Sequence, residues 1–290
     1  MRFRTPFLAI PALLAIAAGL VAPTSTATAA TTSYQRGPNP TEQSVRAANG
    51  PFAYSQFAIP DAEATGFGEG TIYYPNNTSV GTFGGVVIAP GFNADQNSTV
   101  WLGKRLASHG FVAVTITTHE LNDQPYERGK QILAALDYLT GQSPAFVRSR
   151  LDPARLAAVG HSMGGGGTLF AAAQRPSLKA IVPLAPWALA KNWSNVQVPT
   201  MILSGAQDAS APPAEHAEKF YASLTSAPEK AYAKLDVNHV RFAWEHPLIG
   251  KLVVSWLKRF VDEDTRYTQF LCPTATGAVL LEYRATCPLG

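Results

Sequence analysis

The most specific chemical signal in the sequence is a serine enclosed by glycines. Residues 156–168 read Leu-Ala-Ala-Val-Gly-His-Ser-Met-Gly-Gly-Gly-Gly-Thr, which places Ser162 at the centre of a Gly-x-Ser-x-Gly motif. An apolar run before the motif predicts a strand and the residues after it predict a helix, the context in which such a serine is a nucleophile. Glycine at positions 160 and 164 allows a turn too tight for side chains, and the turn exposes the serine Oγ. We therefore predict that Ser162 is the nucleophile of an acyl-transfer enzyme.

A serine hydroxyl needs a base to remove its proton, and the chain has six histidines. His239 follows a predicted late strand, Ala231–Leu235, on a loop at the carboxyl end of the sheet, so we favour it as the base. His246 comes soon after, and chain position alone leaves it as a rival. His161 lies inside the motif and is expected to point away from the reaction. The remaining three are expected to have surface or packing roles: His109, His119 and His216.

The acid that orients the histidine should lie between the serine and the histidine in the chain order Ser, Asp or Glu, His. The predicted strand Thr200–Ser204 leads into Gly-Ala-Gln-Asp, which places Asp208 just beyond a strand end. Its carboxylate would accept the Nδ1 hydrogen of His239, fix the tautomer and stabilise the imidazolium. Asp236 is the rival candidate for the acid, and the alternative interpretation is that it is an ordinary residue of a turn.

The negative charge on a tetrahedral intermediate needs two backbone N–H donors. The residue after the nucleophile, Met163, supplies one of them. The other should come from the loop after the strand Gly85–Ala89, where we choose the N–H of Phe92.

The elements that must hold these residues alternate between strand and helix. Near-continuous apolar runs suit strands buried on both faces, and the alternation predicts a doubly wound, mostly parallel α/β sheet with flanking helices. Two earlier runs, Phe52–Ile59 and Gly70–Tyr74, are interpreted as antiparallel edge strands. A TIM barrel would need eight strand-helix units, which the early part of the chain does not supply. The predicted strands are Gly84–Ala89, Phe111–Thr117, Leu156–Gly160, Ala180–Leu184 and Thr200–Ser204, and the predicted helices are Glu127–Leu139, Met163–Gln174, Ala214–Leu224 and Leu248–Val261.

The start of the chain has a different character from the rest. Arg2 and Arg4 precede an apolar run over about residues 7–21, and small residues follow it up to Ala29. This pattern predicts a signal peptide over residues 1–29, cleaved near position 29 or 30, because the run is shorter than the roughly 20 residues of a membrane anchor. Export to the extracellular space follows from it.

The rest of the chain, residues 30–290, is predicted to be one catalytic domain. The chain is 46% hydrophobic and 15% charged, which suits one large core and not a disordered protein. Removal of the predicted signal lowers the formal net charge from +3 to +1, because it takes away two arginines and no acidic residue. A nearly neutral chain argues against a nucleic-acid partner.

The two cysteines, Cys272 and Cys287, are predicted to form a disulfide, since an exported chain meets an oxidising compartment. The loop that they close has about 15 residues, which the chain-entropy model values at roughly 3 kcal/mol. A metal site is disfavoured because no histidine lies near either cysteine in the sequence.

Several stretches outside the serine motif are similar to one family, the actinobacterial cutinases, which includes polyester hydrolases that act on polyethylene terephthalate. They include Tyr34-Gln-Arg-Gly-Pro-Asn-Pro-Thr41, Gly70-Thr-Ile-Tyr-Tyr-Pro75, Trp256-Leu-Lys-Arg-Phe-Val-Asp262 and Asp264-Thr-Arg-Tyr-Thr-Gln-Phe-Leu-Cys272. The resemblance covers essentially all the mature chain. It implies the α/β-hydrolase fold and a triad of Ser162, Asp208 and His239. It also implies that Phe92 and Met163 are the oxyanion donors, and that Phe92 and Trp187 form an aromatic substrate clamp.

Three features depart from the family pattern. Ser210 stands where a hydrophobic residue usually lies two places after the aspartate, and Asn122 stands where a leucine is expected. The loop Asp236–Trp244, which carries the histidine, is one residue shorter. We therefore expect a groove that is more polar than is usual in the family.

Only a short segment separates the strand ending at Leu184 from the strand starting at Thr200, a common place for a lid domain in this fold. Without a lid, a shallow site lined by Phe92 and Trp187 could receive a polymer segment. The sequence thus predicts a secreted, monomeric serine ester hydrolase acting on cutin, polyethylene terephthalate or short and medium acyl esters, without cofactor, metal or stable membrane insertion. The alternatives are a lipase or general short-chain esterase with little polymer activity, and a non-catalytic surface-binding protein.

Overall fold

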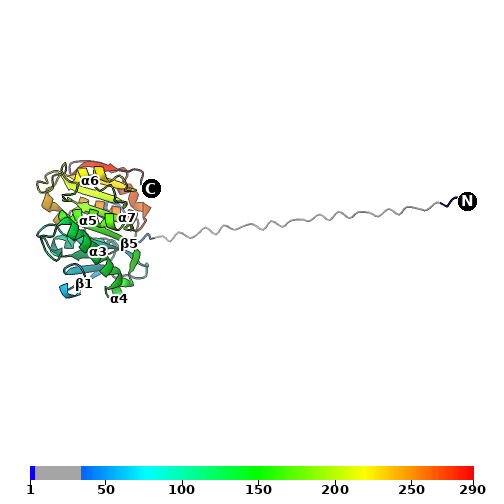
Figure 1. The fold of residues 1–290 in the computed structure, drawn as a ribbon, viewed down its shortest axis with the longest axis horizontal. Helices are drawn as coiled ribbons and strands as arrows, with labels where there is room; N and C mark the ends of the chain where they lie inside the picture. The colour runs from blue at the N-terminus through cyan, green and yellow to red at the C-terminus, as the bar shows by residue number, and fades with distance from the viewer. Residues whose placement is uncertain (4–33) are drawn as a thin grey trace. The chain divides into compact units, whose positions relative to one another are not determined.

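A nine-stranded sheet organises the chain in the computed structural model (Figure 1). The strand order is β1-β2-β4-β3-β5-β6-β7-β8-β9, and the six strands from β4 to β8 in that order are mutually parallel. This confirms the predicted doubly wound, mostly parallel α/β sheet. The strands are β1 (Tyr54–Ile59), β2 (Gly70–Pro75), β3 (Phe83–Ala89), β4 (Phe111–Ile116), β5 (Leu151–His161), β6 (Ala180–Leu184), β7 (Thr200–Gly205), β8 (Lys230–Leu235) and β9 (Leu280–Ala285).

The structure describes residues 1–3 and 34–290, and residues 34–290 belong to one compact unit. The predicted signal peptide falls almost wholly on residues outside the described ones, so it stays a prediction. In the described part of the chain, no helix combines the length and the apolar character that crossing a membrane requires.

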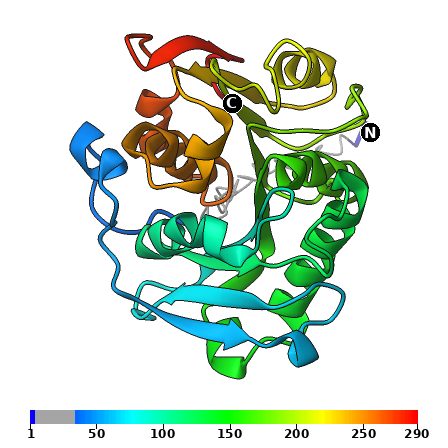
Figure 2. The ribbon, with the colours of Figure 1, turned by 90° about the vertical axis from the view of Figure 1, so that its left-hand side faces the viewer.

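Two layers of helices cover the sheet, because its central strands are apolar on both faces. Figure 2 shows the sheet between α7 and α2 on one side and α3 and α5 on the other. Val86 and Ile88 of β3 belong to the core under α2 and α7, whereas Val87 belongs to the core under α3 and α5, as the two-residue period of a strand requires. The α-helices are α1 (Glu42–Arg46), α2 (Val100–Ser108), α3 (Pro125–Gly141), α4 (Ala145–Arg148), α5 (Met163–Gln174), α6 (Ala217–Ser223) and α7 (Pro247–Phe260), and the 3-10 helices are η1 (Asp61–Glu63), η2 (Gln96–Thr99), η3 (His239–Ala243) and η4 (Thr265–Phe270).

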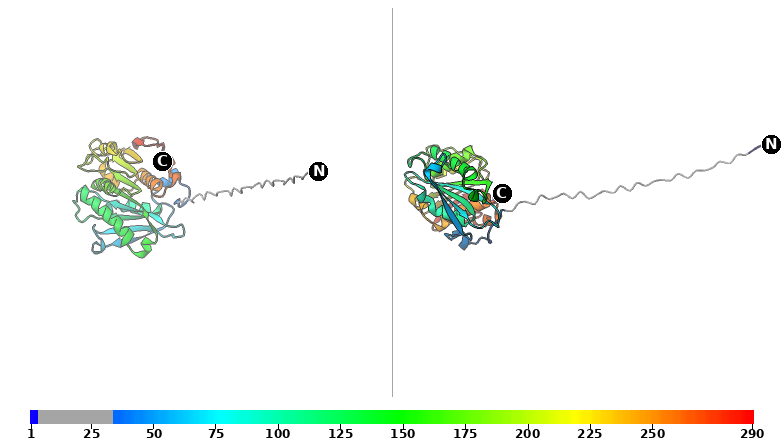
Figure 3. Two further views of the ribbon diagram at one scale, coloured as in Figure 1. Left: turned by 45° about the vertical axis from the view of Figure 1, so that its right-hand side comes forward. Right: turned by 90° about the horizontal axis from the view of Figure 1, so that it is seen from below.

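The two antiparallel strands predicted at the start of the domain are present, but only β1 is an edge. β2 pairs with β1 on one side and with β4 on the other, so the prediction that it is an edge strand was wrong. The second edge is β9, which the sequence analysis missed and which lies at the opposite end of the sheet from β1 (Figure 3). In β9 only Leu280 is buried, so the strand carries little apolar signal.

The segment between β6 and β7, residues 185–199, contains no helix or strand. The parallel strands on either side therefore follow one another without an inserted lid, as predicted. At the other end of the chain, Cys272 and Cys287 form the predicted disulfide.

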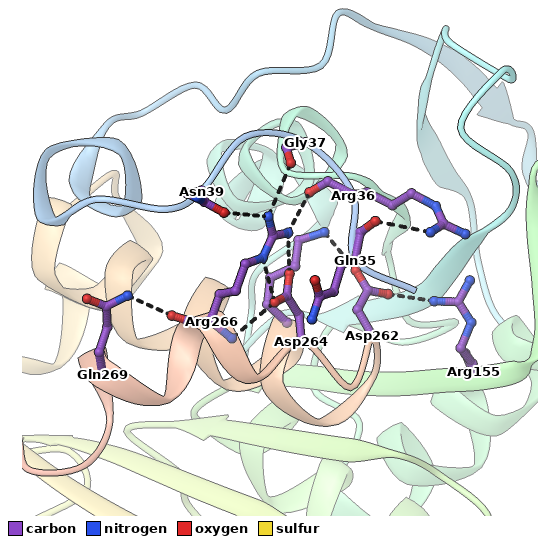
Figure 4. A network of polar contacts seen from close by, with 10 residues as sticks. Gln35, Arg36, Gly37, Asn39, Arg155, Asp262, Asp264, Arg266 and Gln269 are labelled. Atoms are coloured by element: carbon purple, nitrogen blue, oxygen red, sulfur yellow. Dashed lines mark hydrogen bonds and ion pairs between the residues drawn. The ribbon is translucent and has the colours of Figure 1, made fainter. Parts of the chain in front are cut away.

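A cluster of buried ion pairs joins residues 36–39 to the turn after α7 (Figure 4). Asp262 pairs with Arg155 of β5 at 2.6 Å, and Asp264 pairs with Arg266 at 2.7 Å. Arg266 also donates to the carbonyl groups of residues 36 and 37 and to the side chain of residue 39. Both aspartates are buried, and Asp262 also pairs with Lys258 at 2.7 Å. Removal of Arg266 would therefore leave the charge of Asp264 without its ion-pair partner, whereas Asp262 would keep Lys258 if Arg155 were removed.

Candidate active site

Ser162 lies in the sharp turn between β5 and α5. Its backbone has φ 56° and ψ −119°, a left-handed conformation that strains a serine. A Cβ atom at Gly160 would lie 2.2 Å from the carbonyl oxygen of Gly164, and a Cβ atom at Gly164 would lie 2.5 Å from the carbonyl oxygens of Ala89 and Pro90. The turn therefore requires glycine at both positions.

The three residues predicted to form the triad are joined by hydrogen bonds through His239. Nε2 of His239 is 2.9 Å from Oγ of Ser162, and Nδ1 of His239 is 2.7 Å from Oδ2 of Asp208. The residues follow β5, β7 and β8, whose carboxyl ends share one edge because the strands are parallel. Parallel pairing thus brings together side chains that are up to 77 positions apart.

Asp208 is buried and held as a carboxylate. Its Oδ1 accepts hydrogen bonds from the N–H groups of Ser210 and Ala211 at 2.9 and 2.7 Å. Burial favours the neutral form, but the hydrogen bonds from His239 and the Ala211 N–H outweigh that penalty and lower the pKa of Asp208 below its ordinary value. The ionised carboxylate keeps a proton on Nδ1 of His239 and leaves Nε2 free to accept the serine proton.

The two rivals left open by the sequence are engaged elsewhere. Asp236 accepts a hydrogen bond from the Gln207 side chain at 2.8 Å. His246 is the N-cap residue of α7, where Nδ1 accepts the N–H of Leu248 at 3.3 Å. Of the candidate aspartates and bases, Asp208 and His239 are therefore the pair that the geometry joins to Ser162.

Two backbone N–H groups beside Ser162 are available as oxyanion donors. Met163 is the first residue of α5, where N–H groups have no intrahelical acceptor. Phe92 lies in the loop after β3, and this loop passes against the nucleophile, since a Cβ atom at Gly91 would lie 3.0 Å from Cβ of Ser162. Neither N–H has an acceptor among the residues that the structure describes. The positive end of α5 adds a favourable field for negative charge here.

His161 lies in the site, and the expectation that it points away was wrong. Its ring centroid is 4.7 Å from that of His239, and its Nε2 is 3.1 Å from the His239 carbonyl oxygen. Burial, helped by the charge of His239, lowers the pKa of His161 to about 3, so the ring is neutral at ordinary pH. The sequence could not show this contact, because it arises only when the loop that carries His239 folds back over the end of β5.

A cavity of about 410 Å³ opens over Ser162. Phe92 and Trp187 line it, as predicted for the aromatic clamp, and Ser210 contributes a polar group in place of the usual apolar one. Trp187 stacks on His216 with 5.7 Å between the ring centroids, so this buried histidine packs against the tryptophan. Asn122 is not among the residues that line this cavity.

A doubly wound sheet with a serine in a strand-turn-helix motif, followed along the chain by an aspartate and a histidine, defines the α/β-hydrolase class. Residues 28–288 match the PET hydrolase-like family. The chain belongs to this family.

Curated relatives agree with that assignment over nearly the whole chain. A bis(hydroxyethyl) terephthalate hydrolase of Streptomyces coelicolor is 53% identical over 281 residues, which cover 95% of this chain and 90% of the relative. Cutinase 2 of Thermobifida cellulosilytica is 52% identical over 259 residues, covering 88% of this chain and 98% of the relative. Cutinase cut1 of Thermobifida fusca is 52% identical over 259 residues, which cover 88% of this chain and 81% of the relative. The protein is thus a serine-type ester hydrolase, as the resemblance to actinobacterial cutinases predicts.

Proposed function

We propose that this enzyme is a secreted polyester hydrolase that cleaves carboxylic ester bonds through a covalent intermediate on Ser162. His239 is the general base and Asp208 the acid that orients it. The observation that carries the proposal is the unbroken line of hydrogen bonds from Asp208 through His239 to Ser162, at 2.7 and 2.9 Å.

The first half-reaction transfers the acyl group to the enzyme. Nε2 of His239 takes the proton of Ser162 as Oγ attacks the ester carbonyl carbon, and the imidazolium is stabilised by Asp208. The N–H groups of Phe92 and Met163 donate to the oxyanion of the tetrahedral intermediate. When the intermediate collapses, the C–O bond to the alcohol breaks, and the alcohol leaves with the proton from His239.

The second half-reaction releases the acid. His239 removes a proton from a water molecule, which attacks the acyl carbon and forms a second oxyanion in the same place. Collapse returns the proton to Ser162 and frees the carboxylic acid. This chain supplies every group that the cycle needs, so the proposal involves no cofactor or metal.

The surroundings of the cavity support a large, apolar substrate. Exposed apolar side chains occur in the segments that follow the carboxyl ends of β3, β4, β6 and β8, where they can touch an insoluble surface. The names of the relatives point to the same substrates, an aromatic diester and cutin, and we extend them to this chain. These exposed residues are Phe92, Leu121, Tyr126, Leu189, Val240 and Trp244.

The proposal also covers where and in what form the enzyme works. We propose export directed by residues 1–29, action as a monomer, no nucleic-acid partner and no stable membrane insertion. N-terminal sequencing of the exported protein should find residue 30 or 31 first. A mature protein that begins at Met1 would contradict the signal peptide.

The catalytic proposal is tested with p-nitrophenyl esters of rising acyl length and with polyester film, on the wild type and on Ser162→Ala. The wild type should cleave short and medium esters and release soluble acids from the film. Ser162→Ala should lower kcat roughly 10⁴- to 10⁶-fold, because no other group can form the acyl-enzyme. Retained activity in the variant would reject the mechanism. If the wild type cleaves only short esters, the polyester substrate is rejected and the assignment as an esterase remains.

A further inference from the structure

A completely buried arginine lies behind the loop that carries Phe92. Arg128, near the start of α3, has 0% of its surface exposed. Its Nε donates to the carbonyl oxygen of Asp123 at 2.7 Å, and Nη2 donates to that of Leu121 at 2.6 Å. Nη1 donates to the carbonyl oxygen of Pro90 and to the hydroxyl of Thr118, both at 3.2 Å. The guanidinium thus joins the loop after β3 to the loop after β4.

All the acceptors of Arg128 are neutral groups. The nearby carboxylate of Asp123 accepts instead from the side chain of Gln131, at 2.7 Å. Burial lowers the pKa of Arg128 to about 10 and the charge of Asp123 opposes that shift, so the guanidinium is charged at neutral pH. Its fixed fork of donors is therefore directed at backbone carbonyls, and a side chain without that fork would leave buried oxygens unpaired.

Contacts that lead to Arg128 lie on both sides of Phe92 in the chain. Pro90, two residues before Phe92, binds Arg128 directly. Leu121 binds Arg128 and also accepts the N–H of Asn93, the residue after Phe92, at 2.8 Å. The backbone around Phe92 is consequently held on both sides by contacts that converge on one guanidinium.

We propose that Arg128 is a positioning residue of the oxyanion hole, which fixes the Phe92 N–H against Ser162 and so acts on the rate of acyl transfer. The inference rests on the proposed function. An oxyanion donor must lie within about 3 Å of the developing charge, so a small shift of the loop raises the barrier. Binding of the uncharged ester depends much less on this N–H, so KM should change little.

Arg155 is a matched control. It is also buried and also donates to a backbone carbonyl, but it lies near the other end of β5, where it pairs with Asp262 at 2.6 Å. Lysine at either position keeps the charge and loses the fork. Both variants should lose stability, and only the Arg128 variant should lose catalytic rate.

The experiment compares wild type, Arg128→Lys and Arg155→Lys by thermal unfolding, by kcat and KM for p-nitrophenyl butyrate, and by the affinity for two inhibitors. A trifluoromethyl ketone adds to Ser162 and forms an oxyanion, whereas the matching methyl ketone binds without an adduct. For Arg128→Lys we expect kcat and the affinity for the fluorinated ketone to fall about 10- to 100-fold, with KM and methyl ketone affinity within about twofold of wild type. For Arg155→Lys we expect kcat, KM and both inhibitor affinities to stay within about twofold of wild type.

Three results would overturn the inference: unchanged kcat in Arg128→Lys, a loss of kcat without loss of affinity for the fluorinated ketone, or an equal loss in Arg155→Lys. If Arg128→Lys does not fold, Thr118→Val tests the proposal in its place, because it removes one hydrogen-bond acceptor of Arg128 while keeping the shape of the side chain. It should lower kcat about two- to fivefold at constant KM, and an unchanged kcat would reject the proposal. A wild type without ester turnover would reject the proposed function itself, whereas an active wild type matched by an equally active Arg128→Lys rejects only this inference.

Discussion

At the scale of single residues, the proposed mechanism depends on the position of one proton on His239. Oδ2 of Asp208 accepts the Nδ1 hydrogen, and the N–H groups of Ser210 and Ala211 occupy the other carboxylate oxygen. The carboxylate has no remaining freedom to turn, so the imidazole presents Nε2 to Ser162. The lowered pKa of Asp208 keeps this arrangement down to acidic pH.

Asp208→Asn tests that argument directly. An amide of the same shape can donate to Nδ1 and so favour the wrong tautomer, which should lower kcat by roughly 10³- to 10⁴-fold with little change in KM. The control is Asp236→Asn, the rival that binds Gln207, and its kcat should stay near the wild-type value. Steady-state kinetics on p-nitrophenyl butyrate compare the two, and a larger loss in the Asp236 variant would reverse the assignment of the acid.

At the scale of elements, a disulfide encloses the edge strand β9. It pairs with β8 on one side only, and its residues are mostly exposed. The disulfide from Cys272 to Cys287 closes a loop of 15 residues around it, with no free cysteine elsewhere in residues 34–290. Such a loop restricts the unfolded chain and so stabilises the fold.

The double variant Cys272→Ser/Cys287→Ser should lose about 3 kcal/mol of unfolding free energy, measured by urea denaturation. Its kcat should stay close to that of the wild type, because the triad residues follow β5, β7 and β8. Reduction with dithiothreitol should destabilise the wild type by a similar amount and leave the variant unchanged. If reduction destabilises both equally, the disulfide is not the cause.

At the scale of the whole molecule, two buried histidines make stability depend on pH. Burial is the main cause that lowers the pKa of His109 and of His161 to about 3, with nearby positive charge adding to it. The ordinary histidine pKa is about 6.5, so between about pH 6.5 and 3 the unfolded chain binds protons that the folded protein does not. The free energy of unfolding is therefore highest above pH 6.5 and falls as the pH decreases.

His109→Gln should weaken this dependence without touching the active site. Each such histidine contributes a slope of about 1.4 kcal/mol per pH unit, so the loss between pH 7 and pH 5 should be about 2 kcal/mol smaller in the variant than in the wild type. Urea unfolding at the two pH values measures the difference. The exposed His119→Gln is the control, and an identical pH dependence in wild type and His109→Gln would contradict the argument.

Local patterns in the sequence were sufficient for much of the fold. Apolar runs predicted β3 to β8, and β6 and α5 have the predicted bounds, because buried strands and a glycine-rich helix start carry their signal in adjacent residues. The other strands differ by one residue at an end, except that β5 begins at Leu151, five residues before the predicted start, where exposed residues interrupt the apolar pattern. Sequence patterns predicted none of α1, α2, α4, the 3-10 helices or β9. Most of these elements are short, and α2 and β9 have mixed or exposed sequences whose structure depends on neighbouring elements. The serine motif and the order of acid and base were also readable along the chain.

The tertiary structure alone decided which residues meet. The sequence left Asp236 and His246 open, although both follow β8, as His239 does. The contacts separate them: Asp236 binds Gln207 and His246 caps α7, while Asp208 and His239 form the hydrogen bonds that lead to Ser162. The position of His161 against His239 and the contacts of Arg128 have no local signal, since both depend on loops from different strands folding onto one edge. What the sequence by itself determined is the chemistry of each residue and the element that carries it. Which of them lie within hydrogen-bond distance was settled only by the sheet, because contact between distant segments depends on strand order and not on sequence spacing.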